Sequence, residues 1–340
     1  MKPKLFTLAI FILFCFHVHG QTNFRVMFYN VENLFDTFDE PGKNDNDFLP
    51  DGAMHWTQGR YYNKLNNIAK VITSAGEWDT PALVGLCEVE NEKVIKDLTQ
   101  NSPLRKMNYR YIITNSPDTR GINVALMYQR EKFKYLEHKN YTIRFPYNAR
   151  KHTRDILHVT GQISMRDTLD VFVCHFPSRR GGEIESEKDR IYVASVLKSK
   201  SDSLIQIRRN ACIVIMGDFN DEPSNKSISQ ILKAQPISKD ISNQNLYNLF
   251  SSFEKRKNTG SYKYQGQWNM LDQIIVSGNL IVGDQSIKVL PHTASIFYRD
   301  FMLTDDKTYG GKRPKKTYHG FKHEGGYSDH FPVVVDFTVK

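Results

Sequence analysis

Polar side chains that can bind a cation or transfer a proton follow several apolar, strand-like runs in this sequence. The clearest case is residues 213–224, IVIMGDFNDEPS, where an apolar run leads into Asp218 and Asn220. Glu88 and His175 come directly after comparable runs. Because open α/β sheets bind their ligands at the ends of strands, we expect these side chains to share one site. The structural alternatives are an Asx-rich turn and solvated strand ends.

Three further stretches add members to this set. Asn30 follows the first predicted strand, Asp272 stands near the start of a later one, and Asp329 and His330 precede the last. The set is rich in oxygen donors, which suit Mg²⁺, Mn²⁺ or Ca²⁺ better than they suit zinc. Histidines that lie beside carboxylates can act as general acids and bases.

Three arginines stand close to the same strand ends. Arg120 precedes the predicted strand 122–128, and Arg179 and Arg180 follow His175 in a loop with two glycines. Such a loop can bring cations and backbone N–H groups to a phosphate, whereas a basic surface turn is the structural alternative. A divalent cation and arginines together stabilise negative charge that develops on phosphate oxygens. The residues therefore predict hydrolysis of a phosphoester.

Alternating strand and helix patterns predict one α/β domain that positions these side chains. A composition with 40% hydrophobic and 12% aromatic residues excludes a largely disordered chain. Residues 36–55 predict a surface loop, and residues 291–326 predict a long insertion that contains the basic residues Lys312, Arg313, Lys315 and Lys316. The predicted strands are 24–29, 82–87, 109–114, 122–128, 169–174, 213–216, 271–277 and 331–339, and the predicted helices are 57–75, one from about Asn91, 185–209, and one from 225 to about 234.

The first residues predict a secretory signal peptide, 1–20, that is not part of the fold. Lys2 and Lys4 precede an apolar run of about 14 residues, and a small residue, Gly20, follows it. We expect cleavage after Gly20, which leaves residues 21–340 as an exported domain, periplasmic or extracellular, with no membrane span. A retained membrane anchor is the alternative, but the apolar run is shorter than the ~20 residues that cross a bilayer.

The remaining cysteines predict packing residues. Cys87, Cys174 and Cys212 each lie inside an apolar run, and their number is odd once the signal peptide is removed. We expect buried thiols that pack as small hydrophobic side chains, and neither a disulfide framework nor a cysteine metal cluster.

Seven short motifs follow one another in an order that resembles the endonuclease/exonuclease/phosphatase family. They are NVENLFD, LCEVEN, RGINVALMY, HFPSRRGGE, GDFND, LDQIIVS and SDHFPVVVDF, and together they span about residues 24–339. The family includes pancreatic deoxyribonuclease, exonuclease III, inositol polyphosphate phosphatases and neutral sphingomyelinases. The resemblance implies an α/β fold, a four-layer sandwich in which two packed mixed β-sheets are flanked by helices on both outer faces.

The resemblance also implies roles for the metal-binding part of the site. Glu88 would be the main metal ligand, with Asn30 and Asp329 close to the same cation. That cation would be Mg²⁺ or Mn²⁺, with Ca²⁺ as an alternative. Asp218 and Asn220 would orient the attacking water and the scissile phosphate, while the three arginines would bind phosphate.

The histidines take the remaining roles that the resemblance implies. His330, polarised by Asp272, would bind the phosphate or act as a base, and His175 would stabilise the transition state or assist the leaving group. Which histidine is acid and which is base stays open at this point. The sequence departs from the pattern of many relatives at Asn123 and Glu32, where those relatives carry Asp, and neither change removes a catalytic group.

The basic composition favours a polyanionic partner without identifying it. The formal net charge is +9 and the isoelectric point is near 9.2, which fits nucleic acid, inositol phosphates or an anionic lipid surface. We expect a nuclease-like phosphodiesterase that cleaves by in-line attack of an activated water, with residues 312–316 among its contacts to backbone phosphates. An inositol-phosphate phosphatase, a sphingomyelinase-like lipid phosphodiesterase and a catalytically silent polyanion-binding module are the alternatives.

Overall fold

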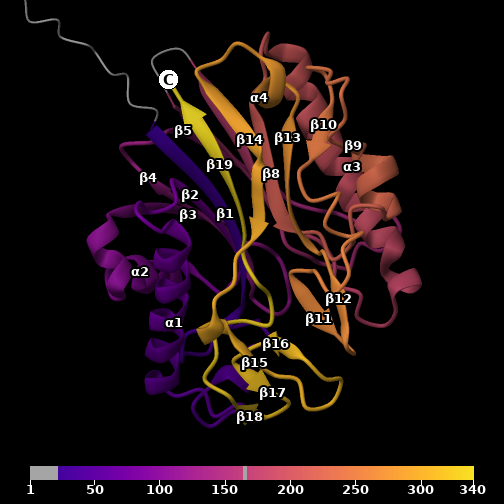
Figure 1. Ribbon diagram of the computed structural model, residues 1–340. Coiled ribbons are helices and arrows are strands. Elements are labelled where there is room, and N and C mark those ends of the chain that lie inside the picture. Colours follow the sequence, from indigo (N-terminus) through magenta and orange to yellow (C-terminus); the bar gives the residue numbers. More distant parts are fainter. Residues whose placement is uncertain (1–21, 164–166) are drawn as a thin grey trace, which may run out of the picture.

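Two mixed β-sheets form the centre of the molecule in the computed structural model, which describes residues 22–163 and 167–340 (Figure 1). The predicted signal peptide lies outside the described residues. The first sheet has the order β14-β19-β1-β2-β4-β3, and the second has the order β5-β6-β7-β8-β13-β10-β9. The strands of the first sheet are β1 (Thr22–Leu34), β2 (Leu83–Val89), β3 (Tyr109–Ile113), β4 (Asn123–Gln129), β14 (Ile287–Ile296) and β19 (Val333–Val339). Those of the second are β5 (Lys134–Tyr141), β6 (Ile156–Gln162), β7 (Thr168–His175), β8 (Ile213–Asp218), β9 (Ala234–Pro236), β10 (Leu246–Asn248) and β13 (Asp272–Ser277).

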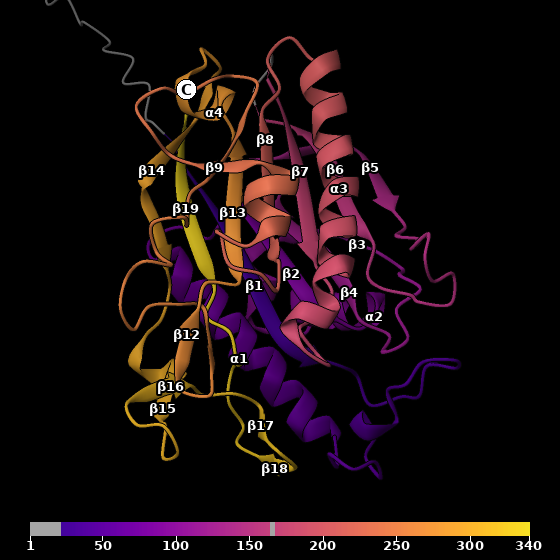
Figure 2. The ribbon, with the colours of Figure 1, turned by 90° about the vertical axis from the view of Figure 1, so that its right-hand side faces the viewer.

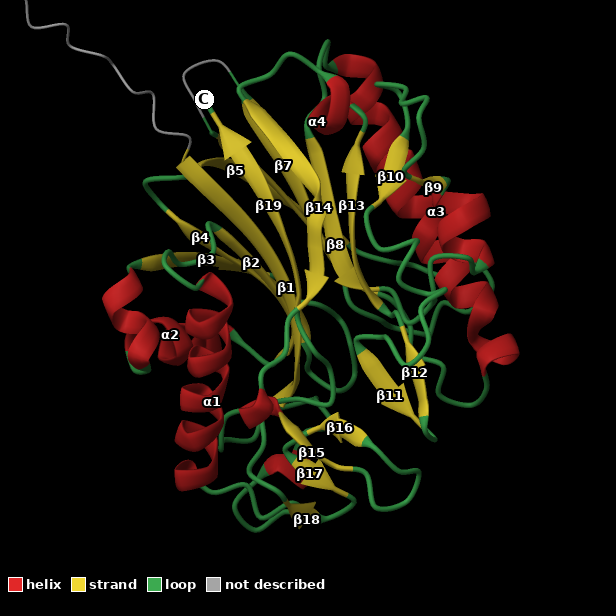
Figure 3. Ribbon diagram, viewed as in Figure 1, coloured by secondary structure: helices red, strands yellow, loops and turns green. Residues whose placement is uncertain are grey.

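Helices cover the outer face of each sheet (Figures 2 and 3). The first sheet carries α1 (Gln58–Gly76) and α2 (Glu92–Gln100), and the second carries α3 (Glu183–Ile207) and a π-helical turn (Ser227–Leu232). Short α4 (Asn279–Val282) leads from β13 to β14, and single 3₁₀ turns lie at Asn46–Phe48, Pro103–Met107 and Asp300–Met302. Within the described residues, no helix has the length and apolar character needed to cross a membrane.

Three hydrophobic cores separate these four layers. Because side chains alternate along a strand, Val26 and Phe28 of β1 pack between the sheets, whereas Met27 packs beneath α1. Met216 of β8 faces the first sheet so closely that a Cβ added at Gly85 would lie 2.5 Å from its sulfur. The third core lies between α3 and the second sheet. The predicted four-layer sandwich is therefore confirmed, and the three cysteines at 87, 174 and 212 are buried free thiols as predicted.

Several predicted boundaries were wrong, and each error has a physical cause. The first strand continues past residue 29 to Leu34, through a register shift between Asn30 and Leu34. β14 extends into residues 291–296, which were predicted as the start of the basic insertion. It contains Pro291, which argues against a strand, but this proline lies in a bulge on the edge of the sheet, where no ladder hydrogen bond is lost. The prediction missed the edge strand β5, most of which is exposed, and its partner β6.

Three small hairpins lie beyond the lower ends of the two sheets in Figure 1. They are β11 (Tyr262–Tyr264) with β12 (Gln267–Asn269), β15 (Leu303–Asp305) with β16 (Lys312–Pro314), and β17 (Tyr318–His319) with β18 (Lys322–His323). The insertion thus forms two of these hairpins, β15–β16 and β17–β18. The third hairpin packs against it, because β11 contacts β16.

Candidate active site

The strand register explains why distant residues of the second sheet meet at one edge. β7 runs parallel to β8 and places His175 opposite Asp218, whereas β13 runs antiparallel to β8 and places Asp272 opposite the same aspartate. The end of two strands and the start of a third therefore coincide. This geometry explains why Asp272, the first residue of β13, meets residues that stand at the ends of β7 and β8.

A cleft of about 770 Å³ opens at this edge and collects the predicted site residues from both sheets. Asp272 is the exception, because it lies fully buried behind His330. The predicted residues that line the cleft are Asn30, Glu88, Arg120, His175, Arg179, Arg180, Asp218, Asn220, Asp329 and His330.

Local backbone distortion turns several of these side chains toward the cleft. Glu88 has a φ of 62°, and the β2–β4 register shifts around it, between Cys87 and Val89. Asn220 has a φ of 50°, and Asn33 has one of 51°. Positive φ is uncommon for residues other than glycine and, like β-bulges, is concentrated near functional sites.

Asp218 is the centre of a buried hydrogen-bond network. Its carboxylate accepts from Nδ2 of Asn30 at 3.0 Å and from the backbone N–H of Asn220 at 2.9 Å. Nε2 of His175 lies 3.7 Å from the carboxylate, and Nε2 of His330 lies 3.9 Å from it. Both histidines can therefore present their Nε2 atoms to a group bound beside Asp218.

The two histidines stand in opposite electrostatic environments. Burial lowers the pKa of His330, but Asp272 and Asp218 outweigh that effect and leave its pKa well above the usual value. Its Nδ1 lies 2.6 Å from Oδ2 of Asp272, so the carboxylate fixes the orientation of the ring. Burial and the charges of Arg154 and other cations hold the pKa of His175 well below the usual value.

Carboxylates of both sheets form a donor set that fits a hard divalent cation. Glu88, Asp218 and Asp329 all reach the cleft, and Asn30 joins them. Burial raises the pKa of Asp218 to about 7 and also raises that of Asp329. Burial raises the pKa of Glu88, but Arg120 and the hydrogen bond from the N–H of Asn33 outweigh burial, so the pKa of Glu88 is lowered. A bound cation would stabilise such a group of crowded carboxylates.

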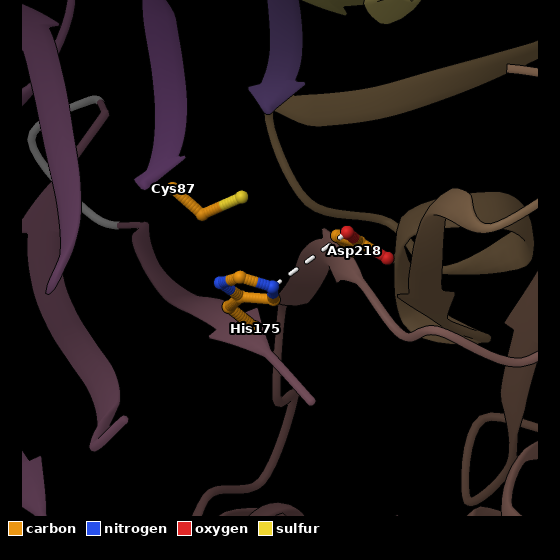
Figure 4. Close-up of side chains that lie close together, drawn as sticks. All are labelled: Cys87, His175 and Asp218. Carbon is orange, nitrogen blue, oxygen red and sulfur yellow. Dashed lines mark ion pairs between the residues drawn. The ribbon is translucent and has the colours of Figure 1, made fainter. Parts of the chain in front are cut away.

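Cys87 is buried beside Asp218 of this set. Cys87, His175 and Asp218 each bring one potential ligand atom to within 4.8 Å of the others, and Figure 4 shows their side chains together. Asp218, Asp272 and His330 form a second such group. The prediction treated Cys87 as a packing residue, and it missed this proximity because residues 87 and 175 belong to different sheets.

The predicted phosphate-binding arginines differ in how firmly the protein holds them. Arg120 donates to the side chain of Asn33 and lies 3.6 Å from Glu88. Arg179 donates to the carbonyl of Asn220 at 2.8 Å and also contacts Glu183 and Asn225, so it braces the loop after β8. Arg180 is exposed at the rim of the cleft.

Other residues of the site escaped the prediction. Tyr262 stacks on His330, with ring centroids 4.6 Å apart. Lys64 is buried and donates to the carbonyl of Tyr327 at 2.7 Å, and its Nζ lies 3.6 Å from Glu32. The side chain of Arg154 is buried and donates to the carbonyl of Phe176. None of these residues stands at a predicted strand end, so the sequence held no signal for them.

Solved structures with the same fold include a phosphatase and a protein crystallised with a DNA product. A family protein from Bacteroides thetaiotaomicron is 17% identical, with 94% of this chain and 96% of that chain covered and a TM-score of 0.57. A mannosyl-6-phosphatase from the same bacterium is also 17% identical, with coverages of 92% and 99% and a TM-score of 0.57. TDP2 from D. rerio, crystallised with a single-strand DNA product, is 14% identical, with coverages of 93% and 99% and a TM-score of 0.56.

Sequence comparison identifies the family. A search of curated proteins finds no match. The chain does match the profile of the Endonuclease/Exonuclease/phosphatase family over residues 25–339, which includes every predicted site residue. The chain therefore belongs to the endonuclease/exonuclease/phosphatase family.

Proposed function

We propose that this chain is an exported, divalent-metal-dependent phosphoester hydrolase that acts as a nuclease-like phosphodiesterase. The observation that carries the proposal is the convergence of Asp218, the His330–Asp272 pair and His175 on one cleft that also holds the carboxylates of Glu88 and Asp329. The family supports phosphoester hydrolysis, and a neighbour crystallised with single-strand DNA supports the nucleic-acid substrate.

In the proposed reaction, water attacks phosphorus in line with the leaving oxygen. The water gives up a proton as a new P–O bond forms to its oxygen, the P–O bond to the leaving group breaks, and the leaving oxygen takes up a proton, so that no net proton is gained or lost. Asp218 and Asn220 orient the water and the phosphate, because Asn30 and the backbone of Asn220 hold the carboxylate in place.

The histidines act through their Nε2 atoms. Asp272 holds Nδ1 of His330, so Nε2 of that ring is directed toward Asp218 and can contact the phosphate or the water. Nε2 of His175 lies 3.9 Å from Glu88 and can stabilise charge on the leaving oxygen. Glu88, Asn30 and Asp329 would hold the divalent cation. When bound, it supplies charge that stabilises the phosphate oxygens.

A substrate panel tests the proposal. Purified protein is assayed with plasmid DNA, RNA, single-stranded oligonucleotides, phosphoinositides and sphingomyelin, each with Mg²⁺, Mn²⁺ or EDTA. We expect metal-dependent cleavage that is fastest on a nucleic acid. Faster turnover of inositol phosphates or lipids than of any nucleic acid would contradict the nuclease proposal. Absence of turnover on the whole panel would indicate a silent binding module.

A further inference from the structure

A second pocket adjoins the catalytic cleft and contains residues that the reaction does not use. It measures about 670 Å³ and is lined by residues of the hairpins β11–β12, β15–β16 and β17–β18. These hairpins lie at the lower end of the molecule in Figure 1. We call this second pocket the side pocket. It shares Tyr262, Tyr264, Gln265 and Asp329 with the cleft, so the two spaces adjoin along these residues.

The walls of the side pocket are fixed to one another. Nζ of Lys263, on β11, lies 2.8 Å from Asp306 and donates to the carbonyl of Gly310 at 2.9 Å. The β11–β12 turn contains Gly266 with a φ of +81°, and a Cβ added there would lie 2.9 Å from Cβ of Tyr309. This glycine is therefore required for the close approach of the two walls. These contacts hold the β11–β12 hairpin against residues 306–310.

Aromatic rings lead from the catalytic histidine into the side pocket. Tyr262 stacks on His330, and the rings of Tyr262 and Tyr264 are 10° from parallel with centroids 6.4 Å apart. Tyr264 is 58% exposed and Tyr309 is 55% exposed, although both line a pocket. Exposed aromatic faces of this kind bind planar rings by stacking, and single-stranded nucleic acids offer such rings.

A few lysines around the side pocket can bind a phosphate, because acidic residues pair with the other cations nearby. Lys312 pairs with Asp305 at 2.7 Å, and Arg313 pairs with Glu324 at 2.9 Å, so much of the predicted basic cluster is neutralised. Unlike Lys263, three further lysines of the pocket wall form no ion pair within residues 22–163 and 167–340. They are Lys307, Lys316 and Lys322. These three lysines can contact one or two phosphates, whereas proteins that bind along nucleic acid often make about 6–10 phosphate contacts.

We propose that the side pocket binds the nucleotide next to the scissile phosphate of a single-stranded nucleic acid. The base stacks on Tyr264 and Tyr309, and its phosphate contacts Lys316. The proposal rests on the proposed function. A single strand fits this pocket better than a duplex does, because the bases of a duplex are already stacked and paired and the volume of the pocket is typical of a small-ligand site.

The test compares two substrates in wild type and in variants of the pocket. The substrates are a single-stranded oligonucleotide and methyl 4-nitrophenyl phosphate, a small diester that cannot span both spaces. For each protein, kcat/KM on the oligonucleotide is divided by kcat/KM on the small diester. We expect Tyr264→Ala and Tyr309→Ala each to lower this ratio by about tenfold, because KM for the oligonucleotide rises. Tyr264→Phe should retain the ratio, because it keeps the ring.

Charge is tested in the same assay. Lys316→Ala should lower the logarithmic salt slope for the oligonucleotide by about 0.7. Lys134→Ala is the matched control, since Lys134 is exposed on the edge strand β5 and lines neither the cleft nor the side pocket, and it should change neither the ratio nor the slope.

The outcomes separate the two proposals. If wild type hydrolyses the small diester but no oligonucleotide, the nucleic-acid function fails and the side-pocket proposal fails with it. If wild type cleaves the oligonucleotide and both tyrosine-to-alanine variants keep the wild-type ratio, the function stands and the side-pocket proposal is overturned. Equal cleavage of the single strand and its duplex would also overturn it.

Discussion

Replacement of Asp272 by asparagine tests whether the buried carboxylate works through His330. Asp272 has no exposed surface, and its Oδ2 lies 2.6 Å from Nδ1 of His330. Asn has nearly the same shape, so Asp272→Asn removes the charge without creating a cavity. A hydrogen bond to a charged group contributes about 1.5–3 kcal/mol, which corresponds to a loss of roughly 10- to 150-fold in kcat/KM.

The assay is a double-mutant cycle on the best substrate of the panel at saturating Mg²⁺. His330→Ala should lower kcat/KM by about 100-fold or more. Adding Asp272→Asn to His330→Ala should lower kcat/KM little further, because the pair acts as one unit. Thermal unfolding of each variant shows that it is folded. If the losses of the two single variants multiply in the double variant, the two residues act independently and the reasoning is refuted.

Three further predictions concern stability and processing. Gly161→Ala should lower the free energy of unfolding by about 1–3 kcal/mol in denaturant titration, because the new Cβ would overlap the buried ring of Phe133; an unchanged midpoint would contradict this packing. Lys64→Met should lower the free energy of unfolding by about 3–5 kcal/mol, because it leaves Glu32 buried without its cation, and adding Glu32→Gln should recover part of this loss. A double variant no more stable than Lys64→Met would refute the ion-pair account. Intact-mass measurement on protein from the native host should give a first residue at or near Gln21, whereas retention of residues 1–20 would indicate an anchored form.

The strand ends could be predicted from the sequence because an apolar run that ends in polar residues is a local signal. Asp218 and Glu88 were found in this way, and the family resemblance supplied the layer arrangement. Two features had no local signal. The turn of Glu88 toward the cleft depends on a register shift against β4, and the stacking of Tyr262 on His330 joins residues 68 positions apart.

The charge of the insertion was predictable, but its distribution in space was not. Lys312 and Lys316 differ by four positions in the sequence, yet one is paired with Asp305 and the other faces the side pocket beside Asp329. The pairing depends on the β15–β16 hairpin, whose register sets Asp305 opposite Lys312. Counting basic residues therefore overestimated the cations that are free to bind a polyanion.

Metal dependence through Glu88 is the central claim, and one measurement tests it most directly. The hydrolysis rate of wild type and of Glu88→Gln is followed on the best substrate of the panel, with Mg²⁺ or Mn²⁺ and with EDTA. We predict that EDTA abolishes turnover, that added metal restores it, and that folded Glu88→Gln is slower by roughly a hundredfold and binds the cation more weakly. Full wild-type turnover in EDTA, or a Glu88→Gln variant as active as wild type, would contradict the account.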